Sequence, residues 1–96
     1  MAIQSFSDKD TEELFVSGYI KKGTGWINVS QIAKRKLDMI HYAAILEDLR
    51  APPGNKLKSL KGDFKGYYSI RINDQWRIIF RWSGAGPYAV KITDYH

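Results

Sequence analysis

The sequence contains no cysteine, only two histidines and no long apolar run. The absence of cysteine excludes disulfides, thiolate nucleophiles and cysteine-based zinc sites. Two histidines, at positions 41 and 96, are too few for a histidine-rich metal site, so we expect neither a metal ion nor a cofactor. No stretch approaches the roughly 20 apolar residues that span a bilayer, and the first ten residues lack the layout of a signal peptide. These absences predict a cytoplasmic protein.

Acidic residues are also scarce, but only in the second half of the chain. The 96 residues carry a net charge of +5. Residues 1–49 hold six basic and seven acidic residues, whereas residues 50–96 hold nine basic and three acidic ones. Such asymmetry is typical of proteins that bind a phosphate backbone. A basic face that only contacts solvent is the alternative interpretation of the same pattern.

The first part of the chain predicts a short strand and a short helix. No repeat, linker or low-complexity tract interrupts the sequence, so we expect one domain spanning residues 1–96. A strand is predicted at Ile3–Phe6. Ser7 and Asp8 are typical residues at the start of a helix, and Gly18 is typical of its end.

A second, longer helix is predicted from about Val29 to Leu46, where apolar residues recur at helical spacing. Asn28 followed three residues later by Gln31 resembles a capping box. The basic cluster at residues 34–36 is interpreted as a solvated helix face, with contact to RNA or to an acidic segment of a partner protein as the alternative. Two prolines and a glycine at residues 52–54 then end the helical half.

From residue 55 onwards the apolar pattern has a period of two, which predicts strands at 55–61, 66–72, 75–82 and 87–96. In the last three strands the inward-facing positions are Tyr68, Ile70, Ile72, Trp76, Ile78, Phe80, Trp82, Tyr88, Val90 and Ile92. Helices followed by consecutive strands predict an α+β fold. In this fold two N-terminal helices pack on one face of an antiparallel β-sheet meander.

The loop between the second and third predicted strands sets their register. A three-residue loop at Asn73–Gln75 keeps the apolar positions on one face and places Arg71 directly opposite Arg77. Like charges facing each other across strands are destabilising by up to about 1 kcal/mol. We therefore expect an anion between them, or a carboxylate such as that of Asp94.

The block LKSLKGDFKGYYSIRINDQWRIIFRW at residues 57–82, together with the final DYH, resembles the HigB-type killer proteins of the RelE superfamily. These are the toxins of bacterial toxin–antitoxin pairs, and the likeness covers essentially the whole chain. It implies a compact α+β domain that cleaves mRNA on translating ribosomes. It also implies a cognate HigA-type antitoxin with a helix-turn-helix, which binds the toxin and represses the operon. Contact with operator DNA would then be indirect, through the antitoxin.

The residues offered by the chain fit that chemistry. Cleavage of RNA without metal uses the ribose 2′-OH as nucleophile, and it needs a base, an acid and cations that stabilise the phosphorane. The predicted catalytic residues are His96, Asp94, Arg77 and Lys61. The predicted substrate contacts are Arg71, Lys58 and Tyr95. Asp94 has an alternative interpretation as a structural partner of Arg77, and Tyr95 as a packing residue.

Lys58 departs from the pattern of the family, in which many relatives have a histidine that is taken as catalytic. A lysine holds a phosphate well but is a poor general acid–base near neutral pH unless its pKa is strongly lowered. Proton transfer then depends more on His96 and Asp94. The departure supports an alternative function, a non-catalytic module that binds RNA or an antitoxin through the same basic sheet. A DNA-binding regulator is disfavoured because no recognition helix is evident.

Overall fold

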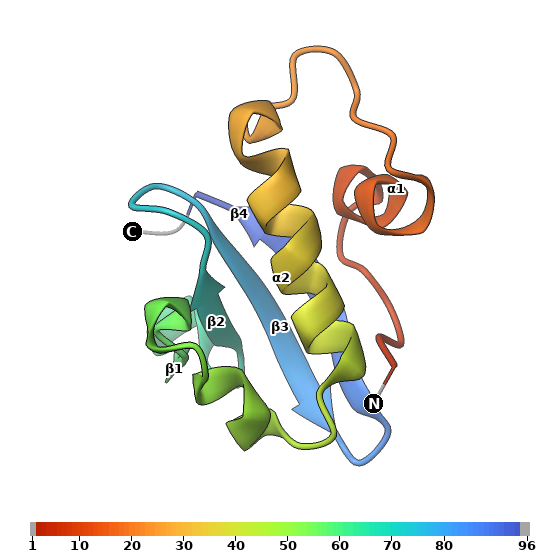
Figure 1. Ribbon diagram of the computed structural model, residues 1–96. Helices are drawn as coiled ribbons and strands as arrows, with labels where there is room; N and C mark the ends of the chain where they lie inside the picture. Colours follow the sequence, from red (N-terminus) through yellow and green to blue (C-terminus); the bar gives the residue numbers. More distant parts are fainter. Residues whose placement is uncertain (1, 95–96) are drawn as a thin grey trace.

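The computed structural model describes residues 2–94, in which two α-helices lie against a four-stranded antiparallel sheet (Figure 1). The strands follow one another in the order β1-β2-β3-β4, and α2 crosses one face of the sheet. The elements are α1 (Lys9–Ser17), α2 (Ser30–Tyr42), β1 (Lys58–Ser59), β2 (Tyr68–Arg71), β3 (Arg77–Ser83) and β4 (Gly86–Thr93). Short 3-10 turns are η1 (Ile27–Val29), η2 (Leu46–Arg50), η3 (Pro53–Asn55) and η4 (Gly62–Phe64). The predicted α+β meander is confirmed.

Helix α1 has the caps that its sequence predicts. The Asp8 carboxylate accepts a hydrogen bond from the Thr11 amide at 3.3 Å, and Gly18 ends the helix with φ +76 while its amide donates to the Leu14 carbonyl. The segment before α1 is extended and lies parallel to β4, with a single bridge between Phe6 and Val90. The predicted strand at Ile3–Phe6 is therefore an extended segment hydrogen-bonded to β4.

Helix α2 differs from its prediction at both ends. The turn η1 precedes it, and Val29 at the N-cap makes no side-chain hydrogen bond, so the capping box predicted at Asn28 is absent. The helix ends at Tyr42 rather than Leu46. The physical reason is that the Asp48 carboxylate accepts hydrogen bonds from the amides of residues 44 and 45, which starts the new turn η2.

The strand predicted at residues 55–61 is reduced to Lys58–Ser59. Asn55 belongs to η3 and Lys56 has a positive φ of 50°, so the chain becomes extended only after them. A non-glycine residue in the left-handed region is uncommon, and Lys56 in this conformation turns the chain back toward the sheet. Its carbonyl is thereby available to β3, as described below.

The register of β2 and β3 agrees with the prediction. Ile70 pairs with Ile78 and Arg71 with Arg77. The Asn73 side-chain oxygen accepts hydrogen bonds from the backbone amides of Gln75 at 2.9 Å and of residue 76 at 2.7 Å, which fixes the three-residue loop. The apolar face thus stays intact. It forms one core with the helices, from Leu14, Leu37, Ile40, Ile70, Ile78, Phe80 and Val90.

A β-bulge in the last hairpin corrects one predicted orientation. Ile79 pairs with Lys91, but Arg81 pairs with Tyr88, so β4 has one more residue than β3 between these pairs. Ala89 takes the left-handed conformation, with φ 53°. The extra residue reverses the alternation, and Tyr88 lies on the face of Arg81. The prediction that Tyr88 points into the core is wrong.

Candidate nucleic-acid interface

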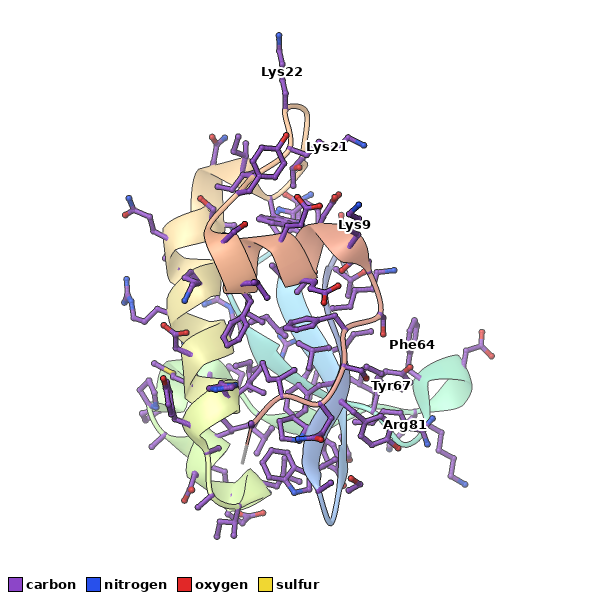
Figure 2. The ribbon with its side chains drawn as sticks, turned by 90° about the vertical axis from the view of Figure 1, so that its right-hand side faces the viewer. Lys9, Lys21, Lys22, Phe64, Tyr67 and Arg81 are labelled. Atoms are coloured by element: carbon purple, nitrogen blue, oxygen red, sulfur yellow. The ribbon has the colours of Figure 1, made fainter. Side chains whose placement is uncertain are left out.

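The sheet has one face under the helices and an opposite face, here called the outer face, that carries most of its cationic side chains. Directly paired residues on neighbouring antiparallel strands project to the same side. The register therefore assigns these basic residues to the outer face: Lys58, Arg71, Arg77, Arg81 and Lys91. None of the strand positions that share this face between residues 58 and 93 is acidic. Figure 2 shows Arg81 on the side of the sheet away from α2. The outer face is thus a basic surface.

Arg77 is held by two hydrogen bonds that place its guanidinium at the edge of this face. Its Nε donates to the Ser69 hydroxyl at 2.9 Å, and its Nη2 donates to the Lys56 carbonyl at 3.0 Å. Ser69 is fully buried, so this contact is shielded from water. The guanidinium is therefore oriented before any ligand arrives, which lowers the entropic cost of binding a phosphate.

Arg71 lies directly opposite Arg77, and its guanidinium forms an ion pair with Asp74 of the β2–β3 loop. A carboxylate was expected next to this pair of arginines, with Asp94 as the example, and the Asp74 carboxylate lies there as the partner of Arg71. Asp74 is fully exposed and Arg71 is one-third exposed. Exposed pairs of this kind contribute little free energy, so a phosphate can displace the Asp74 carboxylate.

Asp94 follows β4 at the same end of the sheet. Thr93 pairs with Arg77, so the chain leaves the sheet beside the row formed by Arg71 and Arg77. The exposed Asp94 carboxylate accepts a hydrogen bond from the Gln75 side-chain amide at 3.1 Å. Sequence reasoning missed Gln75, because its loop is separated from Asp94 by 19 residues in the chain and no register was predicted for the last strand. The predicted site residues Tyr95 and His96 lie outside the described residues.

Lys58 and Lys61 lie on the other edge of the sheet, and both are exposed. Lys58 pairs with Ser69, one row from Arg71. Lys61 lies beyond the end of β1, at the start of η4. The pairing of β1 with β2 continues through the hydrogen bond from the Leu60 amide to the Tyr67 carbonyl, so this part of the chain runs away from Arg77. Lys61 is thus five residues along the sheet from the row of Arg77, which corresponds to roughly 16 Å at 3.3 Å per residue. A ligand that contacts both residues must therefore extend along the outer face.

A buried polar network from α2 supports the position of Arg77, and sequence reasoning missed it. Asn55 is fully buried, and its amide nitrogen donates to the carbonyls of Leu49 at 3.1 Å and Ala51 at 3.2 Å. Its side-chain oxygen accepts a hydrogen bond from the Lys36 ammonium. This network fixes the turn that presents the carbonyl of Lys56 to Arg77.

Lys36 is the exception to the solvated helix face predicted for residues 34–36, because it is only 9% exposed, whereas Arg35 is exposed. Burial lowers the pKa of the Lys36 ammonium below its ordinary value of 10.5, and the positive charges of Arg35 and Arg71 lower it further. A cation in this position repels Arg71 and adds to the positive potential at that end of the sheet. A bound anion would relieve this repulsion.

The site is an open surface. Residues 2–94 enclose no pocket, and no group of three or more histidine, aspartate or glutamate side chains among them could hold a metal ion. No helix in the described part of the chain is long and apolar enough to cross a membrane. An oriented arginine, a basic face and an adjacent carboxylate are suited to a large polyanion that lies across the surface.

Residues 4–96 match the family described as the RelE-like toxin of the type II toxin–antitoxin system HigB. The chain belongs to the HigB-like toxin family. The family match extends over residues 95 and 96 as well as the described residues, so it includes the DYH ending on which the resemblance was based.

Individual relatives agree with this family assignment. The chain is similar to Toxin HigB-1 of Vibrio cholerae, with 50% identity over 48 residues, which is 50% of each protein. It is 42% identical over 55 residues to an uncharacterized protein of Haemophilus influenzae, covering 57% of the chain and 54% of the relative. In these two comparisons the chain spans about half the length of the relative. It is 35% identical to Endoribonuclease HigB of Proteus vulgaris over 94 residues, which is 98% of the chain and 99% of the relative.

The fold has a solved counterpart. The YoeB/ParE toxin from Agrobacterium tumefaciens superposes with a TM-score of 0.52 and 21% sequence identity, covering 100% of this chain and 99% of that one. At this identity the likeness concerns the fold alone. It confirms the RelE-like α+β architecture expected from the sequence.

Proposed function

We propose that this HigB-family protein is the toxin of a type II toxin–antitoxin pair and acts as an endoribonuclease on mRNA. Residues 1–96 form a single toxin domain in this proposal. The name of the Proteus vulgaris relative supports the activity, because that protein aligns over nearly the whole chain. The observation that carries the proposal is the row of Arg71, Arg77 and Thr93 on the outer face, with Asp94 directly after it. This row offers phosphate-binding cations beside a carboxylate.

The proposed reaction is an attack of the ribose 2′-oxygen on the adjacent phosphorus. The 2′-OH loses its proton to a base, the bond to the 5′-oxygen breaks, and an acid protonates that oxygen, which leaves a 2′,3′-cyclic phosphate. His96 is the leading proton-transfer group, and Asp94, two residues before it in the chain, orients it or shares the role. Arg77 stabilises the charge that develops on the phosphorane. Lys61, predicted to share this role, lies too far along the sheet to reach the same phosphate and contacts the strand beyond it. Arg71, Lys58 and Tyr95 contact the substrate, and no metal ion takes part.

Ribosome dependence belongs to the same proposal. An open face without a pocket does little to align a flexible RNA strand, and alignment of the attacking oxygen can lower a barrier by several kcal/mol. The ribosome would supply that alignment. The proposed partners are therefore mRNA, the ribosome and a HigA-type helix-turn-helix antitoxin, all in the cytoplasm.

The test compares the unaltered chain with His96→Ala. The variant should abolish growth arrest and ribosome-dependent cleavage, and its melting temperature should stay close to that of the parent. Expression would be induced without antitoxin, and cleavage sites would be mapped by primer extension. His41→Gln is a matched control, because it also removes an imidazole, but from a residue on α2 whose ring packs against Phe15.

Two results would contradict the proposal. If the His96→Ala variant arrested growth as strongly as the unaltered chain, His96 would have no role in the reaction. Growth arrest by the unaltered chain without any RNA cleavage would favour the alternative, a non-catalytic module that binds RNA or antitoxin, to which the lysine at position 58 already points.

A further inference from the structure

A third arginine on the outer face, Arg81, lies among aromatic rings toward the end of β3 that is distant from Arg77. Its guanidinium carbon is 5.2 Å from the centre of the Tyr67 ring and 5.9 Å from that of Tyr88. Phe64 packs edge-on against Tyr67, with 5.9 Å between ring centres. Figure 2 shows Phe64, Tyr67 and Arg81 together on the side of the sheet away from α2. Cation–π contacts with two tyrosines restrict where this charge can lie.

The backbone around Arg81 leaves room for this arrangement. Gly66 has φ +94, and a Cβ added there would lie 3.0 Å from the Arg81 Nη2. Any other residue would thus be strained and would press on the guanidinium. The bulge at Ala89 contributes as well, because it brings Tyr88 to the outer face. A glycine and a bulge both serve to position one side chain.

Arg81 differs from the neighbouring arginines in having no polar partner. Within residues 2–94 the Arg81 side chain makes no hydrogen bond or ion pair, whereas that of Arg71 pairs with Asp74 and that of Arg77 bonds to Ser69 and Lys56. Its side chain is partly exposed. The ring contacts involve the charge and leave the five N–H donors of the guanidinium available. A stacked, preordered guanidinium with free donors is a suitable binder of a phosphate.

We propose that Arg81 binds a second phosphate of the RNA strand that is cleaved near Arg77. This inference rests on the proposed function. Arg81 is four positions after Arg77 along β3, which corresponds to roughly 13 Å along the strand. One phosphate cannot reach both. Lys58 and Lys91 lie in the row between them, so cations continue along the face from one arginine to the other. The subsite holds a flanking nucleotide by its phosphate and aligns the strand.

The test measures binding without depending on cleavage. The probe is a fluorescein-labelled, single-stranded oligoribonucleotide carrying 2′-O-methyl groups throughout, which cannot be cut by 2′-OH attack. Its Kd for the full chain is measured by fluorescence anisotropy at several salt concentrations. Arg81→Gln keeps much of the side-chain stem and removes the charge. The matched control is Arg35→Gln, since Arg35 is an exposed α2 residue whose side chain also makes no hydrogen bond or ion pair within residues 2–94.

Arg81→Gln should weaken binding about tenfold, the loss expected for one charge-assisted contact. The slope of log Kd against log salt should become shallower by about 0.7, the value for one phosphate on a single strand. Arg81→Lys should keep the slope and recover part of the affinity, and this variant covers the case in which Arg81→Gln folds poorly. Arg35→Gln should change neither quantity.

Three outcomes would overturn the proposal. One is an unchanged Kd and slope in Arg81→Gln. Another is an equal loss in Arg35→Gln, which would indicate general charge only. The third is weaker binding of the antitoxin by Arg81→Gln with RNA binding intact, which would make the subsite a protein contact. A chain that binds the probe through Arg81 but never cuts mRNA would contradict the proposed function and leave this subsite standing.

Discussion

Arg77 combines a proposed role in phosphate binding with a structural role that its hydrogen bonds show. It bonds to a buried hydroxyl, that of Ser69, and to a carbonyl in a separate turn, that of Lys56. Arg77→Ala should therefore lower the free energy of unfolding by about 1–3 kcal/mol, because two acceptors lose their donor. Urea denaturation monitored by circular dichroism measures this loss. An unchanged denaturation midpoint would show that the guanidinium contributes only to ligand binding.

A control is needed to separate the two roles of Arg77. Ser69→Ala removes one of its structural acceptors and keeps the charge. This variant should lose part of the stability but retain growth arrest, whereas Arg77→Ala should lose both. If Ser69→Ala also abolished growth arrest without unfolding, the orientation of the guanidinium and not only its charge would be required.

At this scale the sequence predicts pairings on adjacent strands better than contacts with distant segments. The opposition of Arg71 and Arg77 followed from alternation and a loop length. The bond from Arg77 to Lys56 did not, because it spans 21 residues and depends on a left-handed residue that no local pattern indicates. The buried position of Lys36 was missed for the same reason, since its partner Asn55 lies in a separate turn.

At the scale of elements, the β3–β4 hairpin depends on a bulge whose key residue is not a glycine. Ala89 has φ 53°, and this conformation costs a residue with a Cβ roughly 1–2 kcal/mol. Ala89→Val should lower stability by more than about 1 kcal/mol, because β-branched residues are rarely tolerated there. Ala89→Gly should be neutral or stabilising by up to about 1 kcal/mol. Thermal unfolding of the two variants checks this order, and a more stable valine variant would mean that the bulge is absent in solution.

The bulge also explains why Tyr88 was assigned to the wrong face. Strict alternation through β4 places Tyr88, Val90 and Ile92 together, and only the last two are buried in the core. A sequence without a glycine at position 89 gives no local signal of a bulge. The ends of α2 were misplaced for a related reason. Its apolar spacing continues past Tyr42, but the Asp48 carboxylate caps a competing turn. Element type was predictable here, whereas ends and irregularities depended on single side-chain bonds.

At the scale of the whole molecule, the two sides of the sheet differ: one packs with the helices to form the core, and the other carries the proposed interface. The first 49 residues are nearly neutral, and they include both helices that cover the core face of the sheet. The remaining residues carry the excess positive charge, and five of their cations lie on the outer face. The charge asymmetry in the sequence thus becomes a difference between the two sides of the molecule. This arrangement was predictable once the meander was assigned, because alternation alone decides the side.

An open basic face predicts that cleavage depends on how the RNA is presented. No pocket among residues 2–94 encloses a nucleotide, and position 58 has a lysine instead of an imidazole. Purified protein should therefore cut an mRNA bound to ribosomes at least about a hundredfold faster than the same mRNA alone, because alignment of the 2′-oxygen, the phosphorus and the leaving oxygen lowers the barrier. Single-turnover cleavage rates at equal RNA concentration provide the measurement, and ribosomes with the His96→Ala variant control for contaminating nucleases. Equally fast, sequence-selective cutting of the free mRNA would mean that residues 1–96 align the strand themselves. In that case Arg81 and the cations between it and Arg77, rather than the ribosome, would be the first residues to test for that role.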